Sequence, residues 1–249
     1  MSANIVMMNK LQIQNIVKFY NKREVVKKVS FEVNSGEVIG LLGPNGAGKT
    51  TSFYTVVGLI KPNSGAVILN GQDITHLAMH KRAAKGIGYL PQERSIFRKM
   101  TVSENILSIL ELRKDLKRSD RKTALSRLLS DFSIEHIKDT AAISLSGGEC
   151  RRVEIARCLA INPQFILLDE PFAGIDPVTI TEIKELIRSL TTKGIGILIT
   201  DHNVRETLSL CDRSYIINAG TVIAEGPSHE IIKNKEVQSV YLGEEFTIE

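Results

Sequence analysis

The sequence lacks any hydrophobic run that approaches the ~18 residues a helix needs to cross a bilayer. Its longest apolar runs are Val38–Leu42, Phe165–Leu168 and Ile195–Ile199. Runs this short are typical of buried strands. The chain begins Met-Ser-Ala-Asn, without a basic stretch and a long apolar run, so its start does not resemble a secretory signal. We therefore expect a soluble chain that reaches a membrane only through partners.

Cysteine is scarce, and no strong charge of one sign is present. The three cysteines, Cys150, Cys158 and Cys211, form no CxxC pair. This pattern argues against a disulfide framework and a zinc site, and it favours a reducing compartment. The 32 basic and 28 acidic side chains leave a net charge of only +4, and the basic residues are spread along the chain. Nucleic acid is therefore not an expected partner.

Short apolar runs alternate with longer amphipathic stretches, which predicts an α/β fold around a largely parallel sheet. The pattern changes near Thr101. There Thr101 and Glu104 have the spacing of a helix-capping box, and leucines follow at helical intervals. We interpret residues 101–144, approximately, as a helical insertion. The flanking parts, about 1–100 and 145–249, then form one α/β core within a single domain.

A glycine-rich loop follows the apolar run Val38–Leu42 and precedes a predicted helix, Gly48–Gly58. It consists of Gly43, Pro44, Asn45, Gly46, Ala47, Gly48, Lys49 and Thr50, with Thr51 next. Glycines let backbone amides converge on phosphate oxygens, and a helix N-terminus adds partial positive charge. Lys49 can bridge the terminal phosphates, and the Thr50 hydroxyl can ligate Mg²⁺. The alternative is a chance glycine turn, which the strand–loop–helix context disfavours.

Two carboxylates follow the apolar run Phe165–Leu168. Asp169 suits a Mg²⁺ shell, and Glu170 suits a general base that activates water. On its own, the pair is no more than a strand-end turn. A third motif, Leu145–Glu149, has the central residues Ser146, Gly147 and Gly148, which precede a predicted helix, Cys150–Ile161. It is either a second anion site or a flexible turn.

Taken together and in this order, the three motifs resemble those of the ABC ATPase family along essentially the whole chain. The glycine loop is similar to the Walker A motif, Leu145–Glu149 to the ABC signature, and Phe165–Glu170 to Walker B. The resemblance implies a P-loop NTPase fold. Such a fold has a RecA-like core of mostly parallel sheet, an antiparallel β subdomain and a helical subdomain. It also implies hydrolysis of ATP with Mg²⁺ in a homodimer, where the signature of one copy meets the glycine loop of the other.

The same resemblance assigns roles to four further side chains. Tyr20 would stack on adenine, and Gln92 would contact Mg²⁺ and the attacking water. Asp176 would be the aspartate of the D-loop, and His202 would hold the γ-phosphate. Each has an ordinary alternative: a strand-end aromatic, a surface loop residue, or a hydrogen-bonded histidine at a strand end.

Longer stretches resemble, within the family, the ATPases of lipopolysaccharide export. They cover residues 86–98, 165–177, 199–207 and 240–246. This implies a peripheral position on the cytoplasmic face of an inner membrane, below two transmembrane permease subunits. Cys150 departs from the pattern, because relatives carry a basic or amide residue there. It would either trim a surface contact or leave a reactive thiol.

Apolar and basic residues directly after Gln92 predict a docking site for a membrane subunit, formed by Ile96, Phe97 and Arg98. The alternative is that Ile96 and Phe97 tuck into the helical insertion. Three rival functions are an importer of branched-chain amino acids, a soluble ABC ATPase, and a regulatory module without catalysis. The soluble class usually has two cassettes or a long coiled coil, and a regulatory module would lack the carboxylate of Glu170.

Overall fold

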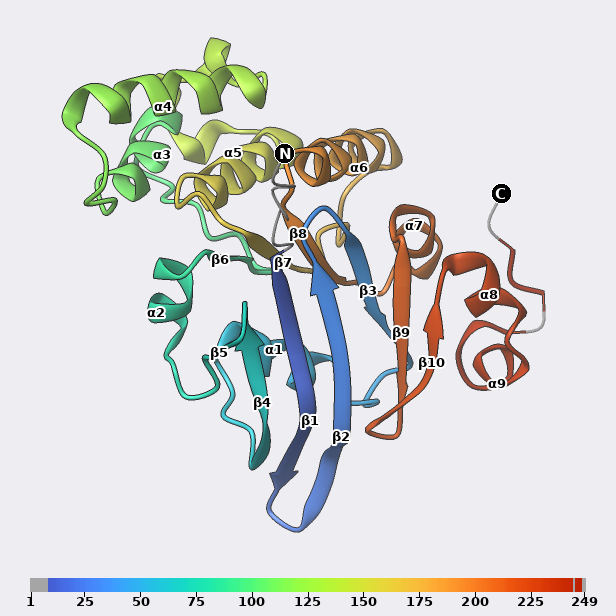
Figure 1. The fold of residues 1–249 in the computed structure, drawn as a ribbon. Coiled ribbons are helices and arrows are strands. Elements are labelled where there is room, and N and C mark those ends of the chain that lie inside the picture. The colour runs from blue at the N-terminus through green and yellow to red at the C-terminus, as the bar shows by residue number, and fades with distance from the viewer. Residues whose placement is uncertain (1–8, 244, 248–249) are drawn as a thin grey trace, which may run out of the picture.

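The computed structural model describes residues 9–243 and 245–247 (Figure 1). The first four residues and Glu244, used above, lie outside this range. Two sheets form the molecule. The antiparallel sheet has the order β2-β1-β4-β5, with bounds β1 Lys10–Tyr20, β2 Arg23–Asn34, β4 Ser64–Leu69 and β5 Gln72–Asp73. The second sheet has the order β10-β9-β3-β8-β7-β6, and its strands are β3 Val38–Leu42, β6 Ile87–Leu90, β7 Phe165–Asp169, β8 Gly196–Thr200, β9 Arg213–Asn218 and β10 Thr221–Gly226.

The second sheet is parallel except at its edge, where β10 pairs antiparallel with β9. The helices are α1 Lys49–Val57, α2 Met79–Ala84, α3 Val102–Leu110, α4 Arg118–Asp131, α5 Gly147–Leu159, α6 Pro177–Thr192, α7 Val204–Leu210, α8 Ser228–Lys233 and α9 Lys235–Val237. The predicted α/β class, with a mostly parallel sheet, an antiparallel sheet and a helical part, is confirmed. Among the described residues, no helix is long and apolar enough to cross a membrane.

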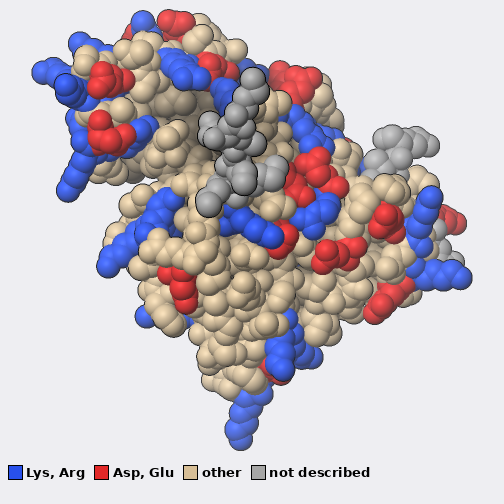
Figure 2. Space-filling view, viewed as in Figure 1, with Lys and Arg blue, Asp and Glu red and all other residues tan. Residues whose placement is uncertain are grey.

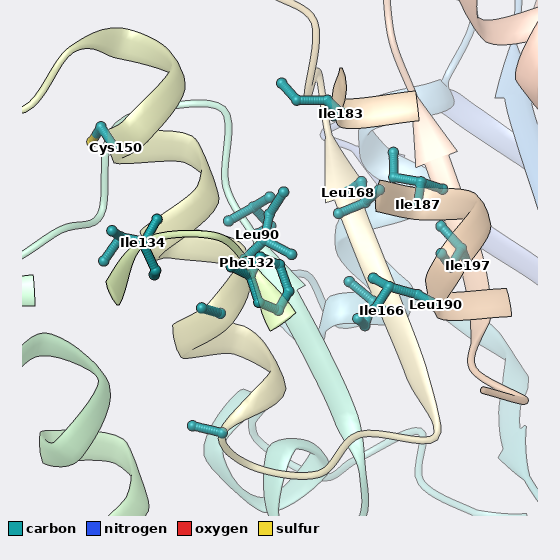
Figure 3. Packing of buried hydrophobic residues seen from close by; sticks show 14 of the residues in the cluster. Leu90, Phe132, Ile134, Cys150, Ile166, Leu168, Ile183, Ile187, Leu190 and Ile197 are labelled. Atoms are coloured by element: carbon teal, nitrogen blue, oxygen red, sulfur yellow. The ribbon is translucent and has the colours of Figure 1, made fainter. Parts of the chain in front are cut away.

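The core strands are apolar at successive positions because both faces of the parallel sheet are covered. Every residue of β3, β7 and β8 is buried. Along β7, Phe165 and Leu167 pack with α1 and the antiparallel sheet. Ile166 and Leu168 point to the opposite face, where they meet residues of α5 and α6 (Figure 3). The alternation of a strand therefore divides one short apolar run between two hydrophobic clusters.

Strand β2 extends well beyond its apolar stretch Phe31–Val33, because it begins at Arg23. Its first half carries exposed charged residues such as Lys27, and Lys28 has a positive φ where the pairing with β1 shifts register. A polar edge strand with such a bulge hides the alternation that marks a strand.

The capping box predicted at Thr101 is present, and it starts α3. The Thr101 hydroxyl accepts from the Glu104 amide at 3.1 Å, and the Glu104 carboxylate accepts from the Thr101 amide at 2.7 Å. The predicted start of the next core helix at Cys150 is wrong, because α5 begins at Gly147 with Ser146 as its cap. The glycines indicated a turn, but a second capping box, from Ser146 to Glu149, starts the helix before them.

Charges of both signs are mixed over the face of the molecule shown in Figure 2, without a continuous field of either sign. Arg82 is a large cation buried in the fold. Arg82 is 1% exposed, and its guanidinium donates to four backbone carbonyls. Two of these carbonyls, of Thr55 and Val56, lie in the last turn of α1, and each accepts from Arg82 at 2.7 Å. The other two, of Thr75 and Leu77, lie in the segment before α2 and accept at 2.7 and 3.0 Å. Arg82 thus ties the end of α1 to the segment after β5.

We expect Arg82→Met to lower the free energy of unfolding by at least about 2 kcal/mol, because it leaves buried carbonyls without donors. Chemical denaturation monitored by circular dichroism measures the loss. Lys81→Met, at the exposed neighbouring position of α2, is the control and should change stability by less than about 0.5 kcal/mol. Equal denaturation midpoints for the two variants would contradict this role of Arg82.

Candidate functional site

The glycine loop runs from the end of β3 to the start of α1, pressed against two neighbouring strands. A Cβ on Gly43 would lie 1.9 Å from the Ile217 carbonyl oxygen, and one on Gly48 would lie 2.8 Å from that of Val25. Both glycines also have positive φ. The loop can follow this path only with glycine at these two positions. Pro44, Asn45 and Gly46 form its more exposed rim, and Ala47 is buried.

Lys49 opens α1 and bends back over the loop. Its ammonium donates to the carbonyls of Gly43, at 2.6 Å, and Pro44, at 2.9 Å. Burial lowers the pKa of Lys49, and the negative charge of Glu170 opposes that shift. Thr50 is exposed and Thr51 half-buried in the first turn of α1, where a helix has unpaired amides. A cation and free amides around one loop fit the phosphates of a nucleotide.

Asp169 ends β7 and is 4% exposed. It accepts from the Tyr89 hydroxyl at 3.2 Å, and burial raises the pKa of its carboxyl. It forms no ion pair with any of the described residues. A divalent cation would supply the missing positive charge, so the donors present fit Mg²⁺. Among residues 9–243 and 245–247, no cluster of three or more His, Cys, Asp or Glu could hold a metal. The remaining ligands would therefore be the Thr50 hydroxyl, phosphate oxygens and water.

Glu170 is the point where three loops meet. Its carboxylate accepts from the Gln92 amide at 2.6 Å and lies 2.8 Å from Nε2 of His202. Its backbone has a φ of +46°, and its amide donates to the Thr200 carbonyl at 2.7 Å. A positive φ at a non-glycine residue is strained and persists where surrounding bonds impose it. The sequence motifs after β6, β7 and β8 are therefore brought together at one carboxylate.

The pKa of Glu170 is raised, first by burial and then by the charges of Asp201 and Asp169, while His202 acts in the opposite direction. A carboxylate with a raised pKa is a stronger base towards water. The site can therefore activate a water molecule next to a bound phosphate.

Sequence reasoning missed two supporting residues, Tyr89 and Asp201. Tyr89 contacts Asp169 as described. Asp201 is 3% exposed, and its two oxygens accept from the amides of Phe172 and Asn203, at 2.9 and 2.8 Å. It thus joins the loop after Glu170 to the loop that carries His202. Its position directly before His202 was the available signal, but its contact with Phe172, 29 positions away, has no local pattern in the sequence.

Ser146, Gly147 and Gly148 lie at the start of α5, and they line a hollow of about 350 Å³ together with Asp176. Asp176 caps α6 by accepting from the amide and the hydroxyl of Thr179, at 3.0 and 2.7 Å, and these bonds lower its pKa. Within the described residues, no hydrogen bond or ion pair joins this hollow to the glycine loop. The predicted phosphate contacts therefore form two separate groups.

The remaining predicted residues differ in exposure. Tyr20 ends β1 with its side chain 46% exposed. In the loop after Gln92, Ile96 is buried in the core, as the alternative for both residues predicted. Phe97, in contrast, is 48% exposed. Arg98 is exposed as well. Cys150 is 3% exposed and burial raises its thiol pKa, so it is neither a surface contact nor an activated thiol.

Comparison with known proteins gives consistent matches. The ABC transporter family profile matches residues 26–173, and that of the branched-chain amino acid ATP-binding cassette transporter matches residues 221–247. The lipopolysaccharide export system ATP-binding protein LptB of Haemophilus influenzae is 54% identical, over 97% of this chain and 100% of its own length.

Solved structures of similar fold include two ATP-binding cassettes. MJ1267 of an ABC transporter, in its ADP conformation, has a TM-score of 0.84 and 31% identity, over 95% of this chain and 100% of its own. MJ0796, in a dimeric post-hydrolysis state bound to ADP and Pi, has a TM-score of 0.75 and 25% identity, over 88% and 98% of the two chains.

We expect Gly43→Ala to abolish ATP binding, because the new Cβ forces the loop away from Ile217. Gly71→Ala, in the exposed turn between β4 and β5, is the matched control: its position also has positive φ, but nothing lies within 4 Å of the added Cβ. The backbone penalty of about 1–2 kcal/mol then falls on an exposed turn, and binding persists. Titration with a fluorescent ATP analogue measures both, and equal affinities would contradict the constraint at Gly43.

Proposed function

Because this chain belongs to the ABC transporter family of ATP-binding subunits, we propose that it powers the export of lipopolysaccharide from the inner membrane. The chain is the ATP-hydrolysing subunit of a transporter. The observation that supports the cargo is the 54% identity to a lipopolysaccharide export ATPase along the full length of that relative. The catalytic part of the proposal rests on the contacts of Glu170.

The proposed chemistry follows from the positions of the side chains. Glu170 takes a proton from a water that attacks the γ-phosphate in line. His202, hydrogen-bonded to the same carboxylate, holds that phosphate and the water in register. Lys49 leaves its two carbonyl partners and neutralises charge on the terminal phosphates. Thr50 and Asp169, with Gln92 nearby, would hold Mg²⁺, which would offset negative charge on the phosphate oxygens. Tyr20 offers its exposed ring to the adenine.

A second copy of the chain completes each site in this proposal. Ser146, Gly147 and Gly148 line a hollow that includes no residue of their own glycine loop, and in the proposal they contact the γ-phosphate held by a partner's loop. Asp176 lines the same hollow and would lie at this interface. The dimeric state of the similar cassette MJ0796 supports such a homodimer.

The transporter would also contain two transmembrane permease subunits, which place this chain on the cytoplasmic face of the inner membrane. Their proposed docking site is the exposed ring of Phe97 with Arg98 beside it. Ile96 contributes by anchoring the loop in the core. This is a polar-rimmed aromatic contact of the kind that dominates the binding energy of interfaces.

Import of branched-chain amino acids is the second candidate, because the C-terminal residues 221–247 match the profile of that transporter class. The match covers only the end of the chain, whereas the similarity to the export ATPase covers 97% of it. Purification from detergent-solubilised membranes, with identification of the co-purifying membrane proteins, separates the two candidates.

We expect Glu170→Gln to retain ATP binding, to accumulate as an ATP-bound dimer, and to lose at least about 100-fold in turnover, because the amide cannot accept the proton. Phosphate release and size-exclusion chromatography measure these effects. Glu111→Gln, at an exposed position beyond α3, is the control. Ordinary turnover in Glu170→Gln would remove this residue from the catalytic role.

We expect Phe97→Ala to weaken binding to the membrane subunits by about 2 kcal/mol or more and to leave ATP affinity unchanged. Leu112→Ala, another exposed apolar side chain at 72% exposure, serves as the control because it lies outside the loop. Co-purification and ATP titration give the two readouts. Complete assembly of the Phe97→Ala transporter would rule out the docking site.

A further inference from the structure

The helix that begins at the signature, α5, carries a line of charged residues on the face that packs against the loop after Gln92. These residues are Arg151, Glu154 and Arg157, each three positions from the next, so they share one side of the helix. All three contact the loop between Pro91 and Phe97. None of the three belongs to the motifs described above.

Glu154 lies at the centre of this contact and is 2% exposed. One carboxylate oxygen accepts from the Ser95 amide at 2.5 Å and from its hydroxyl at 3.2 Å. The other oxygen lies 3.3 Å from Nη1 of Arg151, which also donates to the Pro91 carbonyl at 3.1 Å. Glu154 and Arg151 together thus join α5 to the loop on either side of Gln92.

Arg157 extends the contact to the docking residue. Its guanidinium donates to the Ser95 hydroxyl at 3.0 Å and lies 4.8 Å from the centroid of the Phe97 ring. Asn105 of α3, fully buried, holds the Phe97 backbone at both ends: it accepts from the amide at 2.9 Å and donates to the carbonyl at 3.1 Å. The exposed ring of Phe97 is therefore fixed to α5 and α3.

The network depends on the negative charge of Glu154. Burial lowers the pKa of Arg151 and of Arg157, and in both the charge of Glu154 is the largest opposing influence. Removal of one partner of a buried charge cluster leaves the others without compensation, which is far more disruptive than loss of an exposed pair. Without the carboxylate, the two guanidinium groups repel each other, and the Ser95 amide has a weaker acceptor.

We propose that Glu154 is a positioning residue that makes the signature helix and the docking loop move as one unit. The inference rests on the proposed docking of Phe97 to a membrane subunit. A displacement of Phe97 on docking passes through Ser95 and Glu154 to α5, the helix that Ser146 caps. Engagement of the membrane subunit and closure of the signature on the partner's ATP are thereby coupled.

The test uses Glu154→Gln, which keeps the shape and removes the charge, with Asp131→Asn as control. Asp131 is a carboxylate of the helical part that pairs with Lys193 at 2.7 Å, and among the described residues it has no hydrogen bond or ion pair with the loop. For each variant we would measure ATP affinity and hydrolysis by the isolated chain, and co-purification and hydrolysis in the assembled transporter. Amide hydrogen exchange of Ser95 reports on the contact independently of activity.

Glu154→Gln is expected to keep the ATP affinity and basal hydrolysis of the isolated chain within about twofold, and to assemble with the membrane subunits. Hydrolysis per assembled transporter should fall at least about fivefold, the lower end of ordinary coupling between sites, and the Ser95 amide should exchange faster. Asp131→Asn should match the unmodified chain in every measurement.

Wild-type hydrolysis in the assembled Glu154→Gln transporter, with unchanged Ser95 exchange, overturns the inference and leaves the proposed function intact. Failure of the unmodified chain to assemble with membrane subunits overturns the proposed function instead. Should Glu154→Gln fail to fold, Ser95→Ala carries the test, since it removes only the hydroxyl shared by Glu154 and Arg157. Its assembled hydrolysis should also fall, and no change there contradicts the coupling.

Discussion

The parallel pairing of the buried strands is the constraint on which the site depends. Asp169 at the end of β7 lies opposite Thr200 at the end of β8, and β8 pairs in turn with β3. Parallel strands end at the same edge of a sheet, so segments far apart in the sequence emerge together there. The glycine loop follows β3, and Glu170 and His202 follow the other two strands. The local strain at Glu170 is maintained because its backbone N–H donates a hydrogen bond to the Thr200 carbonyl of β8.

That edge provides only part of the phosphate contacts. The start of α5, where the signature is predicted to bind an anion, lies in a hollow shared with Asp176 that includes no residue of the glycine loop. In the homodimer proposed above, neither half of the site is complete in one chain. Hydrolysis would then depend on the encounter of two chains, and the orientation of α5 would act on the chemistry of the partner's site.

Local patterns were sufficient for the elements that carry the motifs. The apolar run Val38–Leu42 is the strand β3, and the carboxylates after Phe165–Leu168 emerge at the strand end as expected. Patterns were insufficient where a residue acts on a distant segment. Glu154 contacts Ser95, 59 positions away, and Arg82 reaches Thr55, 27 positions away. Neither has a local motif, because each role exists only once the fold has formed.

The buried guanidinium of Arg82 has an electrostatic consequence for the opposite end of α1. It donates to the last carbonyls of the helix, at Thr55 and Val56, where the helix dipole is negative. A fixed cation therefore neutralises that end, while the positive end remains open towards the glycine loop. The orientation of the amides at the start of α1 is thus established during folding. An anion that binds there does not have to supply the free energy of ordering the helix.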